Sequence, residues 1–280
     1  PVLTDRFMKE GVLPNLSRLA KEGSYRRLTT TFPSVSPVAW SSFSTGTHPA
    51  RHNIFDFLDR DRRTYLPLLS STRVGSVKRF FRIGKYQIPR ERPELRQLRK
   101  SKPFWTILGE HRIWSTILRV PITFPPDRFY GAQLSAMSVP DLLGTQGTFL
   151  LYTTRPAGAR FKEGGSRIQV ALDGDRIETA IEGPENTFVV GHPSLTTPLV
   201  IVLDRRRMVA SLSVSDTALE LEPGRLSDWV AIAFRAVPGV TVGGILRFQL
   251  LEMAEHFSLY VSPINIDPEH PALPISHPRS

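Results

Sequence analysis

The 280-residue sequence contains no cysteine. This absence excludes disulfide bonds, thiolate nucleophiles and metal sites with cysteine ligands, although it does not distinguish one cellular compartment from another. The chain also lacks an apolar run of about 18 residues, so no transmembrane span is expected. Its first residues lack the basic and apolar regions of a signal peptide. With 40% hydrophobic residues, the sequence predicts globular material large enough for one large domain or two ordinary ones.

Acidic residues are outnumbered by basic ones, and the formal net charge is +10. Most of the excess lies in residues 73–102, the basic stretch, where eleven lysines and arginines stand against Glu91 and Glu94. This stretch could follow a polyanion or an anionic membrane surface, with nearby aromatic residues available for stacking. It could equally be a solvated excursion from a core that lies near an anionic substrate. Because no nucleic-acid-binding module accompanies the charge, nucleic acid is not the expected partner.

The segment around Ser36 carries the strongest local signal. Pro33 and Pro37 enclose it, and Pro37 suits the first position of a helix because its missing N–H would be unpaired there anyway. Ser36 is therefore predicted to be an N-cap, with its hydroxyl at the positive end of the helix dipole. A phosphate, or the oxyanion of a nucleophile that attacks one, is readily held at this place. The alternative is that Ser36 caps the helix and does nothing more.

Four blocks of the sequence, met in this order, resemble a known family. They are Gly11-Val12-Leu13-Pro14-Asn15-Leu16 through Gly23, the block that begins at Phe32-Pro33, Ser44-Thr45-Gly46-Thr47-His48-Pro49 with His52, and Val139-Pro140-Asp141 through Phe149. They are similar to blocks of the alkaline phosphatase superfamily, specifically of its type I phosphodiesterase/nucleotide pyrophosphatase branch, and the fourth occurs in bacterial members. The resemblance places the nucleophile of the branch on Ser36. The asparagine that helps to hold the phosphoryl oxygen three residues later is replaced by Ala39.

The resemblance implies a metal-dependent hydrolase that acts on a small-molecule phosphate ester, of the phosphodiester or nucleotide pyrophosphate type. Two divalent metal ions, zinc in most members, would be the cofactors, and Ser36 would ligate one through its nucleophilic oxygen. The aspartate of the first strand and the later Asp/His motifs that complete such a site are not found, so the remaining ligands are expected outside this chain. We therefore expect an N-terminal fragment that is inactive alone. The ester, the oligomeric state and the compartment stay open.

The implied fold is α/β, a partial alkaline-phosphatase-like doubly wound core over residues 1–154 that includes the basic stretch. Apolar spacing predicts a helix over residues 3–20 with a break near Gly11, a strand over 25–32 and a buried parallel strand over 113–120.

The loop after this last strand contains Thr123, a candidate substrate-binding residue, because loops at the carboxyl ends of strands surround the site in open α/β sheets. A rigid proline turn without substrate contact is the alternative. Asp141 precedes a glycine-rich turn, and we interpret it as a turn residue rather than a metal ligand.

The pattern changes near residue 155. Residues 167–172 and 176–181 flank an Asp173-Gly174 turn and predict a hairpin. Further strand-like runs follow, so residues 155–262 are expected to form an inserted, mostly antiparallel β-rich unit. Residues 263–280 lack a regular period and are expected to connect back to a C-terminal core outside this chain.

Two functions without catalysis compete with the hydrolase. One is an interaction module that binds a polyanion through the basic stretch, and strong salt-dependent DNA binding would indicate it. The other is a carbohydrate- or protein-binding β-rich unit carried on an inactive core.

Overall fold

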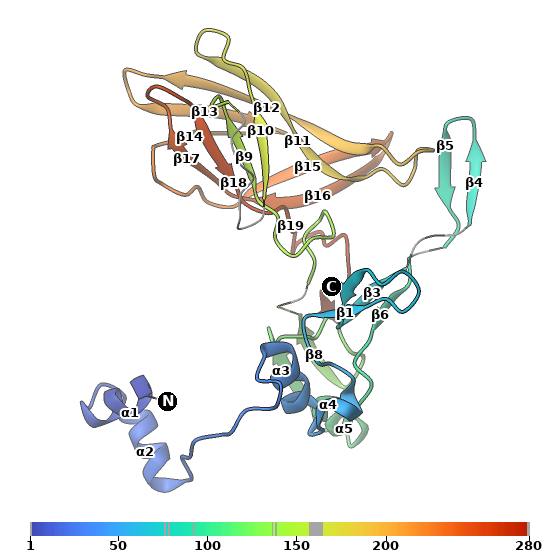
Figure 1. Cartoon of the computed structure of the whole chain (residues 1–280), viewed down its shortest axis with the longest axis vertical. Helices are drawn as coiled ribbons and strands as arrows, with labels where there is room; N and C mark the ends of the chain where they lie inside the picture. The colour runs from blue at the N-terminus through green and yellow to red at the C-terminus, as the bar shows by residue number, and fades with distance from the viewer. Residues whose placement is uncertain are drawn as a thin grey trace.

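The computed structural model describes residues 2–75, 77, 79–91, 93–135, 137, 139–156 and 165–278, so that Lys78 and Arg92 of the basic stretch lie outside the described residues. Figure 1 shows an N-terminal helix pair that stands apart, an α/β unit in the middle and a β-rich unit above it. No helix in these ranges has the length and apolar content that a bilayer span requires.

The helix pair comprises α1 (Val2–Lys9) and α2 (Pro14–Glu22), and neither helix buries a residue. Gly11 separates them with a φ of 75°, as the predicted break near this glycine requires. An extended segment then leads to the rest of the molecule (Figure 1). The strand predicted over residues 25–32 is wrong, because this segment is exposed nearly throughout and pairs with no other strand. The loose alternation and the three threonines of this segment favour a strand only where a partner strand supplies the hydrogen bonds.

Two helices follow, α3 (Ser36–Thr45) and α4 (Pro49–His52), and each ends at a residue in the left-handed conformation, Gly46 or Asn53. The conformation of Asn53 is the one that its residue type favours after a short helix. Val38 of α3 is fully buried, as the sequence predicts for this face. Trp40 and Phe43, which the apolar pattern after Pro37 also predicts to be core residues, are 37% and 57% exposed, because their side of the helix is covered only in part, by the edge-on contact of Phe43 with Phe104.

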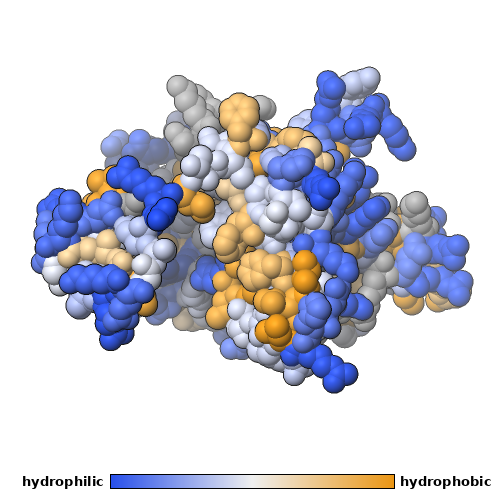
Figure 2. Space-filling view, turned by 90° about the horizontal axis from the view of Figure 1, so that it is seen from below, coloured by the Kyte–Doolittle hydropathy of each residue, from blue (hydrophilic) through white to orange (hydrophobic). Residues whose placement is uncertain are grey.

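The parallel strand predicted over residues 113–120 is confirmed as β7 (Ser115–Leu118), which pairs in parallel with β8 (Gly131–Leu134). Helix α5 (Phe104–Glu110) precedes it. The predicted burial of this strand is only partly confirmed, because Ile117 is the one buried residue of β7. Strand β7 lies at the edge of its sheet, whose strand order is β20-β8-β7. Apolar side chains gather across the middle of the lower face of the molecule (Figure 2). The fold is thus mixed α/β, with few helices and many strands.

The region between α4 and α5 forms three two-stranded antiparallel ribbons, although its sequence shows no clear period. Short strands, charged side chains and few apolar residues hide their pairing from pattern analysis. The ribbons are β1 (Leu58–Arg60) with β2 (Pro67–Leu69), β3 (Thr72–Val74) with β6 (Leu95–Gln97), and β4 (Phe80–Ile83) with β5 (Tyr86–Pro89).

The β4–β5 ribbon reaches across to the β-rich unit (Figure 1). The Gln87 N–H donates to the Phe188 carbonyl at 2.8 Å, and the Val190 N–H donates to the Lys85 carbonyl at 3.0 Å. The Gln87 side chain lies 2.6 Å from the His192 Nε2. Part of the basic stretch is therefore a structural arm between the two units.

The regular elements described between residues 150 and 266 are all strands. Antiparallel pairs dominate the three sheets, and a single core of aliphatic and aromatic side chains joins them. The first sheet contains β9 (Leu150–Thr153), β10 (Ser166–Gln169), β17 (Phe248–Glu252) and β18 (Ser258–Val261). The second contains β11 (Arg176–Glu185), β12 (Ser194–Asp204), β13 (Val209–Val214) and β14 (Thr217–Leu221). The third contains β15 (Val230–Val237), β16 (Val240–Leu246) and β19 (Asn265–Ile266).

The hairpin predicted across Asp173-Gly174 is wrong. The turn exists, with reciprocal N–H to carbonyl bonds between Asp173 and Arg176 of 2.8 and 2.9 Å. However, β10 pairs in parallel with β9, whereas β11 pairs with β12 in another sheet. The longer β12 offers a partner whose buried residues alternate along its length, and this tertiary pairing outweighs the local turn signal.

The ends of the β-rich unit are visible in the pairing. Strand β9 already belongs to its sheet, so the sheet begins at Leu150, slightly before the change of pattern near residue 155. Strand β20 (Ser276–His277), in the proline-rich final segment, pairs with β8 of the α/β unit. The chain thus leaves the α/β unit, builds the sheets and returns.

Candidate active site

Ser36 is the first residue of α3, and its side chain is exposed. The predicted N-cap role is wrong: Val35, with φ −109° and ψ 149°, occupies the cap position, and within the described residues no side chain caps this helix. Because Ser36 lies one residue further along the chain, its hydroxyl is not engaged with the helix and remains available to solvent.

The backbone around Ser36 offers few free donors. The N–H groups of Val38 and Ala39 both donate to the Val35 carbonyl at 3.1 Å, and Pro37 has no N–H. No acidic residue lies in the first turn of α3, so the positive end of the helix dipole is not neutralised there. This helix end presents a hydroxyl in a positive field, but Ala39 adds no side-chain donor for a phosphoryl oxygen.

Thr123 is fully buried. Its hydroxyl donates to the Val120 carbonyl at 2.6 Å, and its own carbonyl accepts from the Gln133 side chain and from the Ser135 hydroxyl at 3.2 and 2.7 Å. These are the contacts of a rigid proline turn, the alternative interpretation of this segment. Substrate binding by Thr123 stays a prediction that no contact in the structure tests.

His52 is fully buried beneath α3. Its Nδ1 accepts the Ile54 N–H at 3.2 Å, so the proton of the neutral ring sits on Nε2, which lies 2.9 Å from the Ser42 hydroxyl and donates to it. Burial lowers the pKa of His52, and electrostatic repulsion from Arg99 and His48 acts in the same direction. His52 is thus a neutral residue that ties α4 to α3.

This arrangement predicts a stability that depends on pH. The unfolded chain takes up a proton at His52 near the ordinary pKa of 6.5, whereas the folded chain does so only at lower pH. Stability from this site is therefore fully present above about pH 6.5 and falls as the pH drops through the lower folded pKa. Urea unfolding at a series of pH values should show this slope, His52→Gln should flatten it, and His111→Gln, at an exposed histidine, should leave it unchanged.

A buried charged network underlies the same region. The Arg99 guanidinium lies 3.1 Å from the Asp127 carboxylate and donates to the Ile122 carbonyl at 3.1 Å. The Trp105 indole N–H also donates to Asp127, at 3.2 Å, and the Asp127 N–H donates to the Gln133 side chain at 3.1 Å. The network joins the end of the basic stretch to α5 and β8, and sequence spacing alone gave no sign of it.

A family model for type I phosphodiesterases/nucleotide pyrophosphatases matches residues 2–156, more than half of the chain. The chain belongs to this family. The match contains Ser36 and the five helices found among the described residues, and it stops shortly after β9, so most of the β-rich unit lies outside it. No curated protein and no solved structure matches the chain.

The described part of this phosphodiesterase-family chain contains no group of three or more histidine, aspartate or glutamate side chains that could hold a metal ion. Asp141 accepts the Thr145 N–H at 2.7 Å through one oxygen and contacts the Thr145 hydroxyl through the other. This is the turn role predicted for it.

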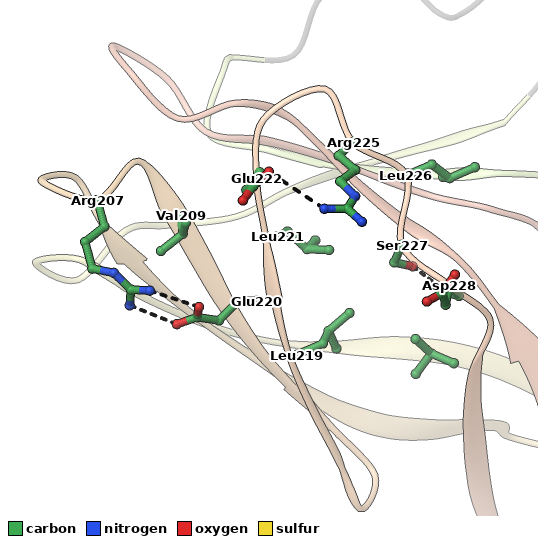
Figure 3. Close-up of a pocket in the computed structure, with 11 residues that line it drawn as sticks. Arg207, Val209, Leu219, Glu220, Leu221, Glu222, Arg225, Leu226, Ser227 and Asp228 are labelled. Atoms are coloured by element: carbon green, nitrogen blue, oxygen red, sulfur yellow. Dashed lines mark hydrogen bonds and ion pairs between the residues drawn. The ribbon is translucent and has the colours of Figure 1, made fainter.

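A hollow of about 370 Å³ lies in the β-rich unit, outside the family match (Figure 3). Four of its five charged residues form pairs: Arg207 contacts Glu220 at 3.0 Å, and Arg225 lies 4.0 Å from Glu222. Asp228 is the fifth.

Proposed function

We propose that the protein is a hydrolase of phosphate esters, of the phosphodiester or nucleotide pyrophosphate type, with Ser36 as its nucleophile. The observation that carries this proposal is the exposed Ser36 hydroxyl at the first residue of α3, inside the region that matches the family. Oγ would attack phosphorus in line with the leaving oxygen, which departs with one of the two esterified groups, and water would then hydrolyse the serine phosphodiester that still carries the other group.

The serine hydroxyl needs activation, because its proton is held too tightly for attack at neutral pH. The buried His52 is not free to act as this base, because both of its ring nitrogens already form hydrogen bonds. We propose that the complete enzyme uses two divalent metal ions, both zinc, as cofactors. The described residues do not fit such a site, so we assign its ligands other than Ser36 to residues beyond these 280.

Exposed apolar surface supports the proposal that the chain is part of a larger doubly wound core. Phe43 of α3, Phe104 of α5 and Leu118 of β7 are 57%, 39% and 66% exposed, and β7 has a free edge among the described strands. Further strands and helices of the same core would cover such surfaces.

The chain expressed alone should bind zinc only weakly and should not hydrolyse bis(4-nitrophenyl) phosphate above background. A lone neutral hydroxyl cannot hold a divalent ion, which needs about four donors. Calorimetric titration of the metal-free chain with zinc chloride measures this directly. A tight stoichiometry of two ions per chain would contradict the assignment of the ligands to residues outside it.

The proposed function itself is tested in the intact protein that contains this chain. We expect hydrolysis of bis(4-nitrophenyl) phosphate with release of 4-nitrophenolate and, after rapid quenching, a 4-nitrophenyl phosphoryl group on the peptide that carries Ser36, detected by mass spectrometry. A phosphoryl group on another residue would move the nucleophile elsewhere.

A further inference from the structure

A second feature of the α/β unit points to a ligand. A groove of about 530 Å³ lies where the β1–β2 ribbon meets the β3–β6 ribbon. None of its lining residues belongs to α3, so the groove is distinct from the surroundings of Ser36. Its cationic lining residues are Arg60, Arg62, Arg63, Arg73, Arg96, Arg99 and Lys100, and its acidic ones are Asp59 and Asp61.

Two acids against seven cations leave the groove with a formal excess of five positive charges. Asp61 accepts the N–H groups of Arg63 and Thr64 at 2.7 and 3.2 Å, and these bonds, together with the charges of Arg63 and Arg73, hold its pKa below the ordinary value. Asp59 accepts the Arg60 N–H at 2.7 Å. Both carboxylates thus bond to the backbone of their own turn and offset only part of the charge. Apart from the buried Arg99, no cation of the groove forms an ion pair within 4 Å among the residues described.

Arg73 and Arg96 stand directly opposite each other in the β3–β6 ribbon. Cross-strand partners project their side chains to the same face, and like charges in this position destabilise a sheet. The two-stranded ribbon therefore carries a repulsion that a bound anion between the guanidinium groups would relieve.

Arg99 gives the groove a fixed charge. Its side chain is only 1% exposed, and Asp127 and the Ile122 carbonyl hold its guanidinium in place. Its Nε–H has no hydrogen-bond partner within the described part of the chain. Burial lowers the pKa of Arg99, but an arginine so close to a carboxylate stays charged at neutral pH.

We propose that this groove binds a compact polyanion with two or more adjacent phosphoryl groups, as in inorganic pyrophosphate or the phosphate chain of a nucleotide. Arginine matches phosphoryl oxygens through pairs of parallel hydrogen bonds. A single phosphate could occupy only a few of the cations, whereas linked phosphoryl groups reach across the ribbon. The volume of about 530 Å³ is within the range of small-ligand sites.

Calorimetric titration of the full 280-residue chain with inorganic pyrophosphate, at fixed ionic strength, tests the proposal. The titration is made with the Ser36→Ala variant, so that hydrolysis cannot affect the measured binding. A lack of binding would therefore not bear on Ser36 as the proposed nucleophile. The double variant Arg73→Gln/Arg96→Gln should weaken binding by about tenfold or more, since each loses charge-assisted hydrogen bonds. Without pyrophosphate it should melt no lower than the parent, because the repulsion is gone.

The matched control is Arg82→Gln/Arg90→Gln, which removes two charges from the same basic stretch at exposed positions outside the groove. Its affinity for pyrophosphate should stay close to that of the parent. Equal weakening in both double variants would show diffuse attraction and overturn the groove. Inorganic phosphate that binds as tightly as pyrophosphate would overturn the need for linked phosphoryl groups, and binding of a DNA oligonucleotide without pyrophosphate binding would favour a polymer instead.

Discussion

Replacing Ser36 with alanine in the intact protein should abolish phosphodiester hydrolysis and leave the fold unchanged. Removal of a covalent nucleophile typically lowers turnover by about 10³-fold to 10⁶-fold. The structural cost should be small, within about 0.5 kcal/mol, because the side chain is exposed and caps nothing. Initial rates with bis(4-nitrophenyl) phosphate, together with a thermal melt of each variant, measure the two effects separately.

Ser34→Ala is the matched control, since Ser34 is exposed two residues earlier in the same segment. Ser41 and Ser42 are weaker controls, because Ser41 is buried and Ser42 bonds to His52. Ser36→Thr should retain part of the activity, as the family uses either hydroxyl. If Ser36→Ala kept more than about a tenth of the wild-type turnover, a barrier change below about 1.4 kcal/mol, Ser36 would not be the nucleophile.

Replacing Asp127 with alanine should destabilise the α/β unit by about 3–5 kcal/mol. The change leaves the Arg99 charge buried and without its counterion, which is far costlier than losing an exposed pair. It also removes the acceptor of the Trp105 indole N–H. Urea unfolding followed by tryptophan fluorescence measures the loss.

Two further variants separate charge from packing. Asp127→Asn keeps the shape of the side chain, so a loss close to that of alanine would assign the effect to charge. The double variant Arg99→Met/Asp127→Leu should recover much of the stability, because apolar side chains of similar volume often replace a buried pair without loss. Glu220→Ala, which breaks the exposed pair with Arg207, should leave the unfolding midpoint nearly unchanged. An equal loss in that control would refute the special role of burial.

Sequence patterns predicted the elements whose signal is local. The break at Gly11, the left-handed Asn53, the parallel strand over residues 115–118 and the long strands of the β-rich unit each follow from residue type or periodicity. The strand predicted over residues 25–32 is wrong because this isolated segment lacks a partner strand. The hairpin predicted at Asp173-Gly174 is wrong because β11 pairs with β12 instead. The local conformational preferences of a segment do not determine which strand it pairs with.

The candidate sites show the same difference between local and long-range signals. The resemblance singled out Ser36 as the nucleophile, and this role stays a prediction; the N-cap position predicted for Ser36 is wrong by one residue, because Val35 occupies it. The basic groove was not found, because its cations come from two separate stretches, residues 60–63 and 73–100. Charge counting located the second stretch, but only the pairing of β3 with β6 shows that Arg73 faces Arg96.

The return of β20 to β8 also sets an order in time during synthesis. His277 contacts the Phe129 carbonyl across 148 residues of chain, which a ribosome adds in about 7 to 30 s at 5–20 residues per second. All strands of the β-rich unit, which end at Ile266, leave the ribosome within that interval. The β-rich unit can therefore fold while β8 still lacks β20, and a sheet that begins before this unit along the chain is completed only after it.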